Sequence, residues 1–448
     1  MKDTASRKNY QVEKIMIRPH HPLYPYCSDL CRWSSSLYNA SLFRIRQSYT
    51  AYGKNVLSSL QEESRKEWET YMPLMQAKHP SWESPFDTNK IPSFYMLDAL
   101  LKLSGNPDYY QEGFPIHTAQ HCIKQACQDM KSYLASMKEY KKNPAKFLGK
   151  PKLSKYKKNG MTTAVLSNQE CRNQDGRLKL PKTALRLDCR PACGKLKEVR
   201  IVPFHDVFFI MPTYEGGERK SCRTSKNIAS IDLGVDNLAA VANNTGAESL
   251  LFSGRALKSI KEKEADDLAL LASRQTKGTE NKLIFSRKAR QIVRKNSLRT
   301  TDYLHKSACA IIRWCRENDI DTLVVGSNRN WKQNANIGHD NNRRFGKIPF
   351  DTFKRMLEYR CRREGINYVE TEEAYTSKAS FYDKDGFDAS SLTGRRIKRG
   401  LYRRSGGELV NADLNGAANI GRKVFPELFE PEKVDLRHIR KIKHPEFA

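Results

Sequence analysis

The sequence lacks several features that define other classes of protein. No run of about 18 apolar residues occurs, so the sequence predicts no membrane-spanning helix. The segment Met1–Tyr10 is polar and basic without an apolar core, unlike a secretory signal, and we expect a cytoplasmic protein. The eleven cysteines are odd in number and include no CxxC pair, which argues against a disulfide framework.

Acidic residues are scarce relative to basic ones. The 448 residues contain 79 Lys and Arg but only 50 Asp and Glu, which gives a net charge of +29. Such self-repulsion is relieved most simply by a polyanionic partner. The basic residues are spread along the whole chain, which favours a long groove for an extended nucleic acid over a small basic patch.

The pattern of apolar residues changes along the chain. Residues 11–18 (QVEKIMIR) alternate as a strand does, and helical spacing follows from about residue 22 to 144. A Lys-rich segment and several short β-type runs occupy residues 145–225, and we expect a small β-barrel or sandwich that the strand at 11–18 joins. Beyond residue 226, strands and helices alternate, which predicts a mixed sheet covered by helices.

A carboxylate follows an apolar run at residues 228–237 (IASIDLGVDN). Alternation places Ser230 and Asp232 on one face of the predicted strand, with Ile231 on the other. The sequence LAAVA comes next and predicts a hairpin that would hold Asp232 rigidly at a sheet edge. Asp-Gly-type turns are common, so this motif alone is weak.

A second carboxylate precedes a helix of small residues at 411–420 (NADLNGAANI). Asp413 is either the N-cap of this helix or a functional acid. The small residues Gly416, Ala417 and Ala418 would let the helix approach the sheet closely and bring Asp413 toward Asp232. Hydrolysis of phosphodiesters by two metal ions needs about three carboxylates from distant parts of a chain, held on adjacent elements.

The sequence resembles the transposon-encoded TnpB (OrfB) nucleases and the related compact type V CRISPR effectors. The resemblance covers most of the chain. It rests on these motifs: FLGKPKLSKYK at 147–157, SIDLGVDNLAAV at 230–241, VVGSNRNWKQNANIG at 324–338, FGKIPFDTFKRMLEYRCRREGI at 345–366, TEEAYTSKASF at 371–381, GRRIKRGLYR at 394–403 and NADLNGAANIGRK at 411–423.

The resemblance implies an α/β RNase H-like (RuvC) nuclease domain and a β-barrel wedge domain with an inserted α-helical recognition lobe. The expected boundaries are 1–21 for the first wedge strand, 22–144 for the lobe, 145–225 for the wedge barrel, 226–375 and 411–425 for the two RuvC parts, 376–410 for a basic target-binding loop, and 426–448 for a basic tail. Within the tail, we expect residues 433–443 to be disordered or bound to RNA.

By the same resemblance, Asp232 and Asp413 are the first and last catalytic acids. Many relatives carry the middle Glu where this chain has Gly326, which cannot bind a metal. Other branches supply it from the strand before the YTS motif, where this chain offers Glu370, Glu372 and Glu373. The TEExYTSK pattern favours Glu373, with Glu372 as the alternative.

Many relatives also carry a zinc ribbon before the last Asp. Residues 376–412 contain neither Cys nor His, so we expect no structural zinc. We expect phosphates to be bound by basic residues of this loop and of the 145–158 segment: Arg395, Arg396, Lys398, Arg399, Arg403, Arg404, Lys150, Lys152, Lys155 and Lys157. Residues 328–344, rich in Asn, Gly and Arg, form either a lid over the site or an ordinary surface loop.

These expectations together describe an RNA-guided DNA endonuclease. Its cofactors would be two Mg²⁺ ions, for which Mn²⁺ could substitute, held by Asp232, Glu373 and Asp413, and a guide RNA. Its partners would be that RNA, double-stranded target DNA and the RNA–DNA heteroduplex, in a monomer or an asymmetric dimer on one guide, associated with the prokaryotic nucleoid. The alternative is a guided DNA-binding protein that has lost cleavage, which Gly326 motivates; a transposase that joins DNA ends is a third interpretation.

Overall fold

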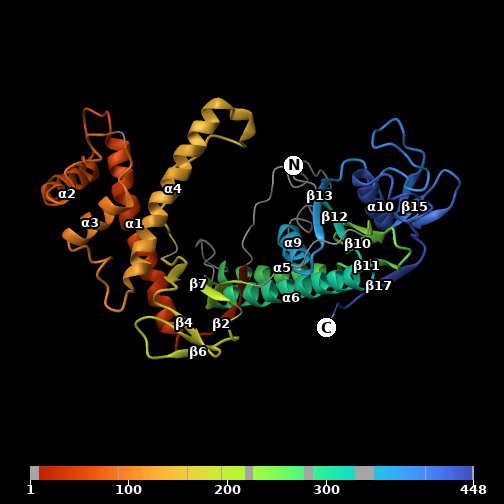
Figure 1. Cartoon of the computed structure of the whole chain (residues 1–448), viewed down its shortest axis with the longest axis horizontal. Coiled ribbons are helices and arrows are strands. Elements are labelled where there is room, and N and C mark those ends of the chain that lie inside the picture. Colours follow the sequence, from red (N-terminus) through yellow and green to blue (C-terminus); the bar gives the residue numbers. More distant parts are fainter. Residues whose placement is uncertain are drawn as a thin grey trace. The chain divides into compact units, whose positions relative to one another are not determined.

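The chain folds into two compact units, residues 1–217 and 218–448, each of which is described by itself (Figure 1). The computed structural model describes residues 10–88, 90–158, 160–192, 194–216, 226–276, 286–327, 348–398 and 400–445. Within these ranges, no helix is both long and apolar enough to cross a membrane.

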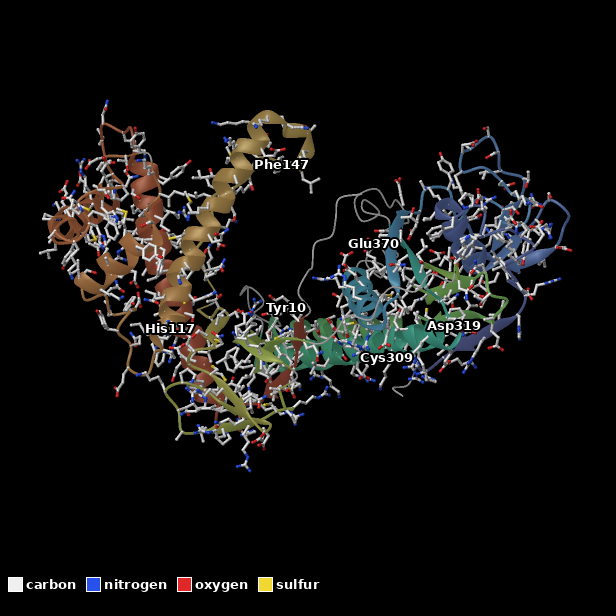
Figure 2. The ribbon with its side chains drawn as sticks, viewed as in Figure 1. Tyr10, His117, Phe147, Cys309, Asp319 and Glu370 are labelled. Carbon is white, nitrogen blue, oxygen red and sulfur yellow. The ribbon has the colours of Figure 1, made fainter. Side chains whose placement is uncertain are left out.

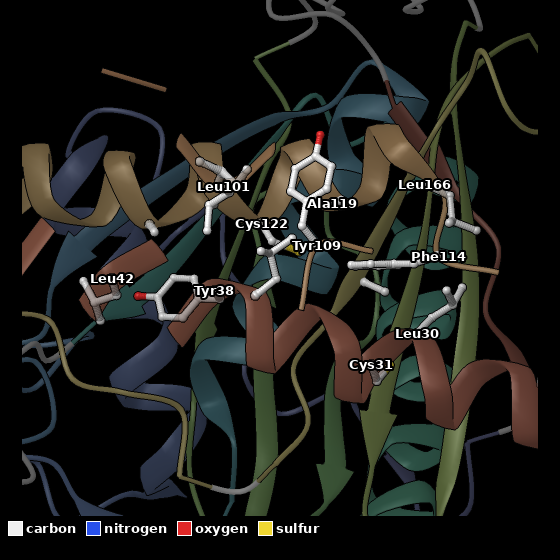
Figure 3. Close-up of a cluster of buried hydrophobic side chains, with 14 of the residues drawn as sticks. Leu30, Cys31, Tyr38, Leu42, Leu101, Tyr109, Phe114, Ala119, Cys122 and Leu166 are labelled. Atoms are coloured by element: carbon white, nitrogen blue, oxygen red, sulfur yellow. The ribbon is translucent and has the colours of Figure 1, made fainter. Parts of the chain in front are cut away.

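The described part of the first unit contains four α-helices. They are α1 (Tyr24–Ala51), α2 (Ser59–Gln76), α3 (Phe94–Leu103) and α4 (Ile116–Lys142), and a short 3-10 turn, η1 (Pro144–Lys146), follows α4. Ser58 caps α2 in a capping box with Gln61, and the side chain of Ser93 caps α3 by accepting from Met96 N. Figure 3 shows the apolar core between these helices, in which Leu42 and Leu101 are fully buried.

The strands of the first unit form two antiparallel sheets. The larger sheet contains β1 (Tyr10–Val12), β2 (Ile15–Ile17), β3 (Ala164–Ser167), β7 (Lys195–Phe204) and β8 (Val207–Glu215). The smaller contains β4 (Arg172–Gln174), β5 (Arg177–Lys179) and β6 (Arg186–Asp188). The segment expected as one strand is two short ones, both paired with β8. The path β1-β8-β7-β3 is open among the described residues, so closure into a barrel stays a prediction.

The Lys-rich segment after η1 has no regular secondary structure from residue 147 to 158. The side chain of Asn39 holds its backbone, because its amide donates to Lys157 O and its oxygen accepts from Lys157 N. Arg46 donates to Ser154 O. The side chains expected to bind phosphates are all exposed: Lys150, Lys152, Lys155 and Lys157.

A mixed six-stranded sheet forms the centre of the second unit. Its order is β13 (Asn367–Glu372), β12 (Thr322–Ser327), β9 (Ile228–Asp232), β10 (Asn237–Asn243), β11 (Ser249–Ser253) and β17 (Ile439–Ile442). β9, β10 and β11 form an antiparallel meander, while β12 runs parallel to both β9 and β13. β17 pairs in parallel with β11, so the expectation of disorder in the basic C-terminal stretch is wrong for residues 439–442.

Helices cover both faces of this sheet. Ala229 and Ile231 of β9 face the cluster that includes α5 (Arg255–Thr276), α6 (Arg287–Glu317) and α9 (Phe350–Glu364). Ile228 faces the opposite cluster, built on α10 (Ala412–Val424). Because side chains alternate along a strand, Ser230 and Asp232 also lie on the α10 face. This alternation agrees with the sequence-based assignment of the two faces.

The segment between Glu373 and α10 folds through hydrogen bonds of two aspartates. It contains a small sheet of β14 (Arg395–Lys398), β15 (Leu401–Arg403) and β16 (Leu409–Asn411). The buried carboxylate of Asp385 accepts from Ser380 N, Thr393 N and Thr393 Oγ1. Asp383 accepts from the backbone and hydroxyl of Ser405. The two carboxylates therefore connect residues 380–385 with Thr393 and Ser405 within this segment.

We predict that Asp385→Asn destabilises the second unit by about 1–3 kcal/mol, because an amide offers one acceptor oxygen to the three donors that the carboxylate now accepts from. Urea unfolding measures the change, with the exposed substitution Glu432→Gln as a neutral control. A zinc-selective chelator should leave the melting temperature of the wild-type protein unchanged. A large drop with the chelator would contradict the prediction of a zinc-free segment.

Candidate active site

Asp232 lies at the carboxyl end of β9, on the face covered by α10. Gly416 of α10 packs directly against it, since a Cβ on Gly416 would lie only 2.8 Å from Asp232 Oδ2. Any larger residue at 416 would push the helix away from the sheet or displace the carboxylate. The small residues that the sequence places at the start of this helix thus allow the close approach.

Asp413 lies in the first turn of α10 and is not its N-cap. The cap is Asn411, whose side-chain oxygen accepts from Asp413 N and Leu414 N. The side chain of Asp413 is therefore free for other contacts. Its Oδ2 accepts from Asn237 Nδ2 at 2.7 Å, and its Oδ1 forms an ion pair with Arg396 at 3.0 Å.

Glu373 follows the last residue of β13 and turns back over the sheet. Its Oε1 lies 2.6 Å from where a Cβ of Gly326 would be, so its carboxylate stands over the end of β12. The chain reverses after it: Thr376 N donates to Glu373 O, and Tyr375 adopts a left-handed φ of 64°. Glu372 is exposed. Glu370, labelled in Figure 2 on β13, is also exposed and pairs with Lys354 at 3.3 Å.

Three carboxylates lie near one another in this site, and their negative charges repel each other when ionised. Burial, followed by the charges of Glu373 and Asp413, raises the pKa of Asp232 well above its usual value. Burial also raises the pKa of Glu373 to about 7, against an opposing effect of Lys354. Arg396 offsets only part of this negative potential. Because the surroundings disfavour the ionised forms of Asp232 and Glu373, a bound cation would stabilise these carboxylates.

The carboxylate oxygens of Asp232, Glu373 and Asp413 are the type of ligand that Mg²⁺ prefers. In the described part of the chain, however, no group of three or more His, Cys, Asp and Glu side chains is close enough to form a ready metal cage. Asp232, Glu373 and Asp413 are electrostatic neighbours, and the Arg396–Asp413 ion pair occupies one of them.

A cavity of about 1590 Å³ opens beside Asp232 and Asp413. Basic side chains from several elements line it: Arg255, Lys258, Arg396, Lys398, Lys441 and Lys443. Arg396 and Lys398 were among the predicted phosphate ligands. Lys441 and Lys443 belong to the stretch that was expected to be disordered or bound to RNA. The sequence analysis missed Arg255 and Lys258, because a basic first helical turn looks like solvated surface until α5 is placed at the sheet edge.

The remaining residues of the predicted basic loop lie elsewhere. Arg395 and Arg403 are exposed on β14 and β15. Arg404 pairs with Asp383 and Glu408 and lies over the ring of Tyr382. Arg399 and the 328–344 segment lie outside the described residues, so both stay predictions.

Two buried asparagines of α10, which the sequence analysis also missed, hold the turn after Glu373. Asn415 donates to Ala379 O and accepts from Phe381 N. Asn419 donates to Thr376 O and to Ala379 O. The signal was available, because polar residues four apart on an otherwise small and apolar helical face require buried partners. These bonds fix the turn that carries Glu373 to the helix that carries Asp413.

The comparisons with known proteins agree on one group of relatives. Residues 213–332 match the OrfB_IS605 family, described as a probable transposase. Residues 350–420 match the TNB domain of Cas12f1-like proteins. The first matched segment contains Asp232 and the second contains Glu373 and Asp413, so the two matches together include all three candidate acids. The resemblance inferred from the motifs is confirmed.

Several solved structures are similar to the chain at low sequence identity. The cryo-EM structure of a Cas12f1–sgRNA–target DNA complex is similar over 89% of this chain and 82% of that one, with 11% identity and a TM-score of 0.50. The mini RNA-guided endonuclease CRISPR-Cas_phi3 is 11% identical, with 93% and 92% of the two chains covered and a TM-score of 0.41. No curated protein matches the sequence. The Cas12f1 likeness supports a shared fold at low identity.

We predict that Glu373→Gln stabilises the metal-free protein at pH 8 by up to roughly 3 kcal/mol, the free energy of a pKa rise from 4.5 to about 7. Between pH 4.5 and about pH 7, the folded wild type binds more protons than the unfolded wild type. The free energy of unfolding of the wild type therefore falls as the pH rises through this range. The gain should vanish near pH 4, where both states are protonated.

Urea unfolding in the presence of EDTA at several pH values measures this effect. Glu372→Gln, on the exposed neighbouring side chain, is the matched control and should leave the pH dependence unchanged. Equal stability of wild type and Glu373→Gln at pH 8 would show that the Glu373 carboxylate is not strained by its surroundings.

Proposed function

We propose that this chain is an RNA-guided DNA endonuclease that hydrolyses phosphodiester bonds of target DNA next to a short motif read by the protein. The observation that carries the proposal is the cavity in which Asp232 and Asp413 meet a wall of cations. Acids alone would repel a phosphate backbone, and cations alone would only bind it. The combination supports binding of a polyanion with its phosphates brought to the carboxylates.

Asp232, Glu373 and Asp413 are the residues that would hold Mg²⁺ or Mn²⁺. The bound ions would supply activation of the attacking water and neutralisation of charge on the leaving oxygen. Asn237 orients the Asp413 carboxylate through its amide, and Arg396 holds the other oxygen of the same carboxylate. Arg255, Lys258, Lys441 and Lys443 would position the strand by its phosphates, without reading its sequence.

The proposal assigns roles to the rest of the chain. We infer that the second unit is an RNase H-like (RuvC) domain, with the 376–410 segment as its target-binding loop. The helices α1–α4 would be the recognition lobe, inserted between β2 and β3 of a wedge formed by β1–β8. The exposed lysines at 150–157 would contact the backbone of the guide or the heteroduplex. The Cas12f1 structure was solved with sgRNA and target DNA, which supports these partners for this chain.

Two other functions compete with this one. The chain could be a guided DNA-binding protein without cleavage, because Gly326 stands where many relatives carry the middle Glu. Against that alternative, both Asp motifs are intact, and Glu373 supplies a third carboxylate beside Asp232. A transposase that joins DNA ends would give strand-joined products, and no feature of the site specifically supports joining.

We predict that Asp232→Ala or Asp413→Ala lowers cleavage at least about 10²-fold while guide and target binding stay unchanged, because these side chains hold ions and not bases. In the assay, the protein is purified with its RNA and the RNA is sequenced. A matched DNA duplex is then added with Mg²⁺, and its cleavage and binding are measured. Glu317→Ala, an exposed acid at the end of α6, is the control. Binding without scission by the wild type at any Mg²⁺ concentration would select the inactive alternative.

We further predict that Glu373→Gln abolishes cleavage, whereas Glu372→Gln leaves it within about threefold of wild type, as expected for a surface substitution. The two variants carry the same chemical change on adjacent residues and therefore control for each other. The reverse result, with Glu372 required and Glu373 dispensable, would transfer the third ligand to Glu372.

A further inference from the structure

The strand β12 lies between the two strands that present Asp232 and Glu373. In the sheet order β13-β12-β9, Val325 of β12 pairs with Ile231, and Gly326 pairs with Thr371 of β13. Gly326 and Asp232 therefore lie side by side at the ends of adjacent strands. A carboxylate that reaches from β13 toward Asp232 has to cross the backbone at Gly326.

The side chain of Glu373 takes this path. A Cβ on Gly326 would lie 2.6 Å from Glu373 Oε1 and 2.8 Å from Glu373 Cγ. It would also lie 2.6 Å from Ile420 Cδ1, which comes from α10 above the sheet. Non-bonded carbon atoms do not approach this closely without displacement of one partner. The φ of Gly326 lies outside the left-handed region, so space and not backbone conformation requires glycine here.

We propose that Gly326 is a positioning residue whose missing side chain leaves the space through which Glu373 reaches Asp232. The inference rests on the proposed function, in which Glu373 is the third acid of the site. One space at the end of β12 accepts one carboxylate, carried either by residue 326 or by residue 373. The glycine is then a requirement of the site built on Glu373, and not the trace of a lost one.

Ile420 has to be separated from Glu373 in any test, because both would meet the new side chain. Ile420→Val removes Cδ1 and serves as the common background. In that background we compare two single substitutions, Gly326→Ala and Glu373→Ala. We also compare two double substitutions, in which Glu373→Ala is combined with Gly326→Ala or with Gly326→Asp. Two bonds separate Cβ of an aspartate from its carboxylate oxygens, so Gly326→Asp can place an oxygen where Glu373 Oε1 now lies.

The readouts are the melting temperature without metal and Mn²⁺ binding by electron paramagnetic resonance. Gly326→Ala should lower the melting temperature when Glu373 is present and leave it unchanged when Glu373→Ala is present, a coupling that the double-mutant cycle isolates. Gly326→Ala alone should weaken Mn²⁺ binding about 10–100-fold, as expected when a metal ligand is displaced. Gly326→Asp with Glu373→Ala should bind Mn²⁺ more tightly than Glu373→Ala alone.

An equal loss of melting temperature in both backgrounds, or failure of both to fold, would overturn the proposal, because Gly326 would then serve general packing. Failure of the aspartate to recover any Mn²⁺ binding would overturn the idea of one shared space. The two proposals fail separately. If the wild type bound no Mn²⁺, the proposed function would fail, while the metal-free coupling between Gly326 and Glu373 would still decide this inference.

Discussion

The close packing of α10 on the end of β9 is the constraint on which the second unit depends. Gly416 allows the helix to approach so near that its backbone almost touches Asp232. Asn411 caps the helix, and the cap leaves Asp413 free to face Asn237. The same helix reaches across to the turn after Glu373 through Asn415 and Asn419. A single helix thus sets the distances among three acids that lie far apart in the sequence.

This packing concentrates negative charge, which the surrounding protein only partly offsets. Burial and mutual repulsion raise the pKa of Asp232, and burial raises that of Glu373. Arg396 pairs with Asp413, and further basic side chains line the cavity. The arrangement places carboxylates beside a wall of basic side chains, which are the two features that the proposed metal-dependent nuclease would use.

Within the second unit, local patterns in the sequence predicted some features of the site and missed others. Alternation along residues 228–232 identified the face of Asp232, and small residues at 416–418 predicted the close helix. The N-cap was harder, because Asn411 and Asp413 are both good caps and only geometry separates them. The C-terminal strand β17 was missed because its pairing with β11 joins residues 190 positions apart, for which no local pattern exists.

The sequence by itself determined the resemblance to TnpB and Cas12f1-like proteins, the two candidate aspartates and the α/β character of the second unit, because these depend on local periodicity and on short ordered motifs. Only the tertiary structure decided which glutamate stands beside Asp232, why residue 326 is glycine, and which cations line the cavity. These properties arise from contacts between elements that are distant in the chain. In such contacts, a difference of one side-chain length decides whether two groups meet.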